Sequence, residues 1–146
     1  MNNLQSEYKK DFYAWTSHHA DLIRHRKFEE IDIENLAEEI ESMGRSNRRE
    51  LISRFAVLIA HLLKWKFQPI RRSKSWIVTI KNQRMDITDL LQESPSLKHE
   101  IESQLSHAYD KAALIASEQT GIDETEFPHD CPFTLEQCLD NQFFPE

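Results

Sequence analysis

The chain has 146 residues, of which 39% are hydrophobic and 29% are charged, a balance typical of a folded globular protein rather than a disordered one. Only two glycines and five prolines are present, which argues against a fold of many short strands joined by tight turns. The two cysteines are too few for a disulfide scaffold, and no apolar run approaches the roughly 20 residues that span a bilayer. We therefore predict a cytoplasmic protein with free thiols.

The net charge of −7 conceals a strong segregation of charge along the chain. Residues 51–85 carry eight basic side chains and no acidic one, whereas residues 86–146 carry fourteen acids and two bases. A further run over residues 29–41 contains acids and no base. This segregation predicts either a basic binding surface or internal pairing of the acidic and basic segments.

Two helices are predicted in the N-terminal part of the chain. Residues 6–26 place apolar and aromatic side chains at intervals of three and four, as on one face of a helix. Asp32 is a suitable N-cap for a second helix over residues 33–43, and Gly44 is typical of a helix C-terminus. We therefore expect a break in the helical structure at Gly44.

The third predicted helix, over residues 46–67, should be the centre of the fold. Ser46 can cap its N-terminus, and Pro69 should enforce its end. Its apolar side chains cover a wider arc than one stripe, which is typical of a helix surrounded by others.

Three more helices are predicted towards the C-terminus, over residues 75–93, 95–119 and 134–140. The β-branched run at 77–80 would also suit a strand, but a lone strand would have nothing to pair with. Ser94 and Pro95 form a cap followed by proline at the first helical position, and Thr134 and Gln137 form a capping-box pattern.

The fold class that follows is all-α. We predict one domain over residues 1–146, built as a bundle of four to five main helices plus a short C-terminal helix. The tail over residues 121–146 contains several phenylalanines and should pack on the bundle.

The basic segment over residues 64–84 is one candidate binding surface. Cations interleaved with aromatic rings can hold phosphates and stack on unpaired bases, so this segment could bind nucleic acid. The net negative charge opposes general affinity for nucleic acid, and internal pairing with the acidic segments is the alternative. The candidate binding residues are Lys64, Trp65, Arg71, Arg72, Lys74, Trp76 and Arg84.

A second, weaker hypothesis is a metal-dependent hydrolase that uses Glu38, Glu39 and His61. Carboxylates that meet in a helical bundle can bind iron, manganese or magnesium, and His61 lies in an apolar run. The Glu-x-x-His pattern of di-metal bundles is absent, however, and a buried histidine is more often a hydrogen-bonded core residue. We therefore predict no metal site and no cofactor.

No glycine-rich phosphate loop, nucleophile elbow, zinc-protease motif or calcium loop occurs in the chain. The function that best fits is a non-enzymatic helical module that binds a protein partner, with the charge-segregated surface as the recognition element. The oligomeric state is not encoded in any pattern, and a homodimer remains open.

Several strings also resemble a known family. They are DFYAW, IENLAEEIESMGRSNRREL, HLLKWKFQP, SPSL and the closing CPFTLEQCLD. In this order they resemble the bacterial family called domain of unknown function 29 (DUF29), over roughly Tyr8 to Pro145. The resemblance implies an all-helical domain and brings no activity, substrate or catalytic residue.

Overall fold

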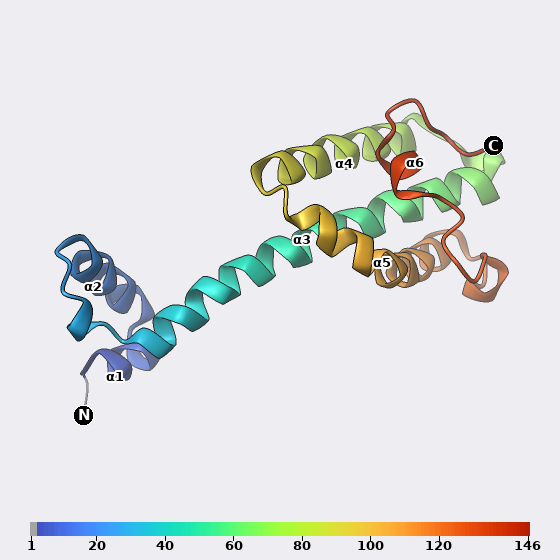
Figure 1. Ribbon diagram of the computed structural model, residues 1–146. Helices are drawn as coiled ribbons and strands as arrows, with labels where there is room; N and C mark the ends of the chain where they lie inside the picture. Colours follow the sequence, from blue (N-terminus) through green and yellow to red (C-terminus); the bar gives the residue numbers. More distant parts are fainter. Residues whose placement is uncertain (1–2) are drawn as a thin grey trace. The chain divides into compact units, whose positions relative to one another are not determined.

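The computed structural model describes residues 3–146, and its regular structure over that range is helical, without a strand (Figure 1). The all-α class is therefore confirmed, including the short C-terminal helix. No helix in the described range combines the length and apolarity needed to cross a lipid bilayer. The α-helices are α1 (Asn3–Lys10), α2 (Phe12–Arg24), α3 (Ile33–Phe67), α4 (Lys74–Glu93), α5 (Leu97–Thr120) and α6 (Leu135–Leu139), and the 3₁₀-helices are η1 (Phe28–Glu30), η2 (Pro69–Arg71) and η3 (Glu124–Glu126).

The chain divides into two compact units. The N-terminal unit extends to Ser46 and contains α1, α2, η1 and the first part of α3. The C-terminal unit covers Asn47–Glu146 and contains the rest of α3 with the remaining helices.

The predicted helix over residues 6–26 is wrong, because Asp11 divides it into α1 and α2. The Asp11 carboxylate accepts a hydrogen bond from the Ala14 amide at 3.1 Å, so Asp11 is the N-cap of α2. The aromatic spacing continues across this break: the ring centroids of Tyr8 and Trp15 are 5.0 Å apart. Periodicity alone therefore concealed the break.

The predicted break at Gly44 is also wrong, because α3 is one helix of 35 residues. Gly44 is not a C-terminal residue, Ser46 is not a cap, and the helices expected over 33–43 and 46–67 are continuous. A helical glycine costs about 1 kcal/mol relative to alanine, which is less than the cost of ending one helix and nucleating another. The local signal was real, but it was too small to end the helix.

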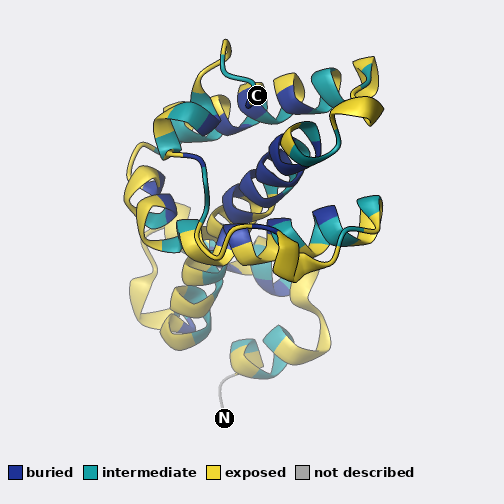
Figure 2. Ribbon diagram, turned by 90° about the vertical axis from the view of Figure 1, so that its right-hand side faces the viewer, coloured by how far each residue is buried: buried dark blue, intermediate teal, exposed yellow. Residues whose placement is uncertain are grey.

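The core of the C-terminal unit forms around the second half of α3. Helices α4, α5 and α6 lie around this part of α3 (Figure 1), and its residues are largely buried (Figure 2). Small side chains of α5 are buried at intervals of four, at Ala108, Ala112 and Ala116, which allows α5 to pack closely in the core. The wide apolar arc of this segment predicted its central position, and the burial of its side chains agrees with that prediction.

Helix α4 begins one residue earlier than predicted, at Lys74, and α5 begins two residues later than predicted, at Leu97. The amide of Ser94 donates to the Leu90 carbonyl at 2.9 Å, so Ser94 is the C-cap of α4 and cannot cap the next helix. The amide of Leu97 donates to the Ser94 carbonyl in a tight turn, and α5 then extends to Thr120, with Gly121 as its C-cap.

The tail after Gly121 packs its aromatic side chains into the core of the C-terminal unit. Phe127, Phe133 and Cys138 are buried in the same cluster as α3. The capping box of Thr134 and Gln137 is present at the N-terminus of α6, with both reciprocal hydrogen bonds formed. The tail thus contributes to the core rather than only closing the chain.

Candidate interaction surfaces

Arg84, a predicted binding residue, is an internal anchor. Only 1% of it is exposed, and burial lowers the pKa of its guanidinium. Its Nε donates to the Cys138 carbonyl at 2.7 Å, and its Nη2 donates to the carbonyls of Phe143 at 2.8 Å and Gln137 at 3.3 Å. Arg84 therefore holds the end of α6 and the residues after it against α4.

Lys64 is likewise buried, with 7% of its surface exposed. Its Nζ donates to the Gln119 side-chain oxygen at 2.8 Å and lies 4.7 Å from the centroid of the Trp76 ring. Burial lowers the pKa of the Lys64 ammonium. Lys64 and Trp76 are thus brought together, but as a cation–π contact within the unit.

Trp65 and Arg72 also bind each other. The Arg72 Nε donates to the Trp65 carbonyl at 2.8 Å, and its guanidinium carbon lies 4.8 Å from the Trp65 ring centroid. Its Nη2 donates to the Pro145 carbonyl at 3.4 Å, while the Phe144 ring lies 5.1 Å from the Trp65 ring. The C-terminal residues therefore occupy this part of the basic segment.

Arg71 and Lys74 are the two candidate cations that stay free. Both are exposed, and neither side chain has a hydrogen bond or ion pair within residues 3–146. The remaining members of the predicted binding set have partners inside the C-terminal unit. Within this set, fewer cations are therefore available to an external ligand than the sequence suggests.

Glu38, Glu39 and His61 each have a partner within their own unit. Glu38 accepts from Arg45 at 2.6 Å, and Glu39 accepts from the Tyr8 hydroxyl, both in the N-terminal unit. His61 belongs to the C-terminal unit, where its Nδ1 lies 2.9 Å from the Val57 carbonyl oxygen and burial lowers its pKa. Nowhere in the described range do three or more His, Cys, Asp or Glu side chains gather in a way that could hold a metal ion.

A buried polar cluster at the centre of the N-terminal unit was not predicted as a group. His19 and Asp32 are each 2% exposed, as is Trp15, whose ring stacks on the His19 imidazole at 4.1 Å. The Asp32 amide donates to His19 Nε2 at 3.0 Å, and His19 Nδ1 lies 3.0 Å from the Trp15 carbonyl oxygen. The Asp32 carboxylate accepts from the Trp15 indole at 3.3 Å and from Asn35 at 2.7 Å.

This polar cluster joins α2 to the start of α3. Asp32 was predicted as a helix N-cap, and His19 lies four residues after Trp15 on the helix face predicted over residues 6–26. The spacing of the two residues gave no sign that the imidazole would accept the Asp32 amide. The cluster links α2 to the start of α3 through hydrogen bonds, and none of its buried side-chain nitrogen or oxygen atoms lacks a partner.

The N-terminal unit exposes most of its large apolar side chains. Eleven large hydrophobic side chains are exposed among the described residues, and seven of them belong to this unit. These seven are Phe12, Tyr13, Ile23, Phe28, Ile33, Ile40 and Met43. We call the part of this set on α3, formed by Ile33, Ile40 and Met43, the α3 apolar face.

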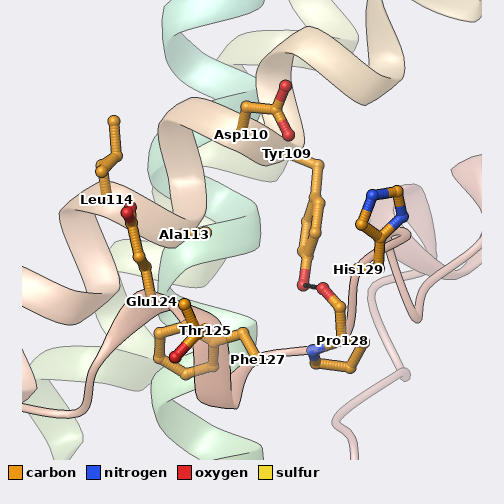
Figure 3. A pocket seen from close by; sticks show the side chains of 9 residues that line it. All are labelled: Tyr109, Asp110, Ala113, Leu114, Glu124, Thr125, Phe127, Pro128 and His129. Atoms are coloured by element: carbon orange, nitrogen blue, oxygen red, sulfur yellow. Dashed lines mark hydrogen bonds between the residues drawn. The ribbon is translucent and has the colours of Figure 1, made fainter.

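A surface cavity of about 470 Å³ lies between α5 and the tail (Figure 3). Tyr109, Glu124 and His129 contribute polar atoms to its lining, and the Tyr109 hydroxyl donates to the Pro128 carbonyl at 2.5 Å. Burial raises the pKa of Tyr109 to about 12, so this hydroxyl stays protonated near neutral pH. Tyr109 therefore serves this region as a hydrogen-bond donor that ties the tail to α5.

The two cysteines also lack activation. Burial raises the pKa of the Cys131 thiol, and it raises that of Cys138 to about 12. A thiolate, rather than a thiol, is the reactive form of cysteine. Neither residue therefore has the character of a catalytic nucleophile.

Comparison with known proteins identifies one family. A family model described as "Domain of unknown function DUF29" matches residues 7–144, which confirms the resemblance in the sequence. No curated protein and no solved structure matches the chain.

Proposed function

The chain belongs to the DUF29 family, whose description names no activity, and we propose from its surfaces that it is a helical module that binds a protein partner. The proposal places the binding surface on the N-terminal unit. The exposure of seven large hydrophobic side chains on this small unit is the observation that carries it.

The α3 apolar face is the centre of the proposed surface. Ile33 and Ile40 are seven residues apart and so share one side of the helix, and Met43 neighbours Ile40 at i+3. Ile33 is 66% exposed and Ile40 57%. Covering such side chains contributes roughly 1.5–3 kcal/mol each when burial is complete, which is enough to drive association.

The charge around the α3 apolar face indicates the chemistry of the partner. Glu34, Glu38 and Glu41 are exposed on the same part of α3, and among residues 3–146 only Arg45 forms an ion pair with any of them. A protein surface with an apolar centre and a rim of lysine and arginine would complement this face. Nucleic acid, the alternative ligand, would be repelled by these carboxylates.

The experiment compares the wild-type chain with Ile40→Glu and with Met85→Glu, an equally exposed position on α4 that serves as the control. Each chain is used to capture proteins from native lysate, and the captured partner is then purified and titrated. We expect the wild type and Met85→Glu to bind alike, Ile40→Glu to bind at least tenfold more weakly, and affinity to fall as salt increases. Equal binding by all three chains would refute the proposed surface.

A second arm of the experiment tests nucleic acid. Single-stranded and duplex probes are titrated with the wild type and with Arg71→Ala/Lys74→Ala at low salt. We expect no binding by either chain. Binding by the wild type that the double substitution abolishes would favour the alternative function over the proposed one.

A further inference from the structure

The C-terminal residues of this chain lie on Trp65, Arg72 and Arg84 in the manner of a bound peptide. Arg84 and Arg72 donate to main-chain carbonyls, those of Phe143 at 2.8 Å and of Pro145 at 3.4 Å. Contacts to carbonyls hold an extended segment whatever its side chains are. We name the surface formed by Trp65, Arg72 and Arg84 the tail groove.

Aromatic contacts add selectivity to the tail groove. The Phe144 ring lies 5.1 Å from the Trp65 ring, and the guanidinium carbon of Arg84 lies 5.5 Å from the Phe144 ring centroid. Pro145, the residue after Phe144, is buried. The tail groove thus contacts an aromatic ring and covers the proline that follows it, in addition to binding the carbonyls.

The tail leaves one hydrogen-bond donor of the tail groove without a partner. Arg84 is almost completely buried, yet its Nη1 has no hydrogen-bond partner, and neither Arg84 nor Arg72 pairs with a carboxylate within residues 3–146. Buried arginines are normally paired. A segment with one further acceptor at Nη1 would therefore be bound better than the tail itself.

The occupant is connected to the fold through an exposed segment. Residues 140–142 are exposed, whereas Cys138 is buried in the core on the other side of this segment. Release of residues 143–145 would end the ring contact between Phe143 and Phe133, whereas the hydrogen bonds from Arg84 to the Cys138 and Gln137 carbonyls do not involve these residues. Arg84 would therefore still anchor the end of α6 if the last residues were displaced.

We propose that the tail groove is a docking site for an extended aromatic–proline peptide segment, and that the chain's own Phe143, Phe144 and Pro145 occupy it in cis. The partner is a protein with such a segment and a carboxylate or carbonyl placed to reach Arg84 Nη1. This site is separate from the α3 apolar face and does not depend on it.

The test uses a fluorescent synthetic peptide of residues 139–146 and three full-length chains: the wild type, Phe144→Ala and Met85→Ala. A tail held in the same chain has an effective concentration in the millimolar range, so it should outcompete peptide at micromolar concentration. The wild type and the Met85→Ala control should therefore bind the peptide weakly. Phe144→Ala weakens the internal occupant. We expect fluorescence anisotropy to report at least tenfold tighter peptide binding by Phe144→Ala.

Two further variants separate a docking site from a nonspecific effect. A peptide with Phe144→Ala should lose binding, and Arg72→Ala in the Phe144→Ala chain should weaken it. The proposal is overturned if folded Phe144→Ala binds the peptide no better than the wild type, or if the altered peptide binds equally well. If Phe144→Ala does not fold, Phe144→Leu replaces it: tighter peptide binding than by the wild type supports the docking site, and equal binding overturns it.

Discussion

Replacement of Gly44 by alanine tests the continuity of α3. Gly44 is exposed inside the helix, and a Cβ built on it meets no atom within 4 Å. Alanine should therefore fit without strain and reduce the backbone entropy of the unfolded chain. From the helix propensities of glycine and alanine, we expect a gain of about 0.5–1 kcal/mol in the free energy of unfolding.

The same substitution at Gly121 is the matched contrast. Gly121 follows α5 with a φ of +79°, in the left-handed region, and no atom lies within 4 Å of its built Cβ either. Space is thus equal at the two glycines and only the backbone differs. Alanine at Gly121 should cost about 1–2 kcal/mol.

Urea titrations followed by far-UV circular dichroism measure both effects as shifts of the unfolding midpoint at constant slope. Opposite signs for Gly44→Ala and Gly121→Ala are the expected result. If α3 ended at Met43 with Gly44 in a left-handed C-terminal position, alanine would destabilise at both sites. Destabilisation by Gly44→Ala would therefore refute the continuous helix.

Three other changes have defined outcomes. Arg84→Met should destabilise the chain by about 3 kcal/mol in the same urea assay, because three carbonyls lose a charged donor; an effect below about 1 kcal/mol would contradict its role as an anchor. Thr134→Ala should cost about 1 kcal/mol through loss of the α6 capping box, whereas Thr134→Ser should be nearly neutral. The free energy of unfolding should fall between about pH 9 and pH 12, because the folded chain holds the pKa values of Cys138 and Tyr109 at about 12 and the unfolded chain loses these protons at lower pH. A free energy of unfolding that does not change over this range, or a pH dependence that Tyr109→Phe leaves unaltered, would contradict this prediction.

Helical periodicity predicted the fold class and the buried part of α3, because burial follows the 3.6-residue repeat directly. The boundaries at Asp11 and Gly44 were wrong because each depends on a balance of about 1 kcal/mol. At Asp11 a side-chain cap outweighed continuous periodicity, while at Gly44 continuity outweighed a residue typical of helix ends.

The partners of the basic segment could not be predicted from local patterns. Arg84 binds carbonyls more than 50 positions away in the chain, and main-chain carbonyls have no residue-type signature. Lys64 similarly finds Gln119 on α5. Charge counting identified these cations as a group, but it contained no information on which of them would be buried.

The division of the tryptophans gives each unit its own optical signal. Trp15 belongs to the N-terminal unit and stacks on the His19 imidazole, whereas Trp65 and Trp76 belong to the C-terminal unit and contact Arg72 and Lys64. A chain with Trp65→Phe and Trp76→Phe would show tryptophan emission from the N-terminal unit alone, and Trp15→Phe would leave only the tryptophan emission of the C-terminal unit. The order in which the two units lose their structure can thus be followed by intrinsic emission, without any label.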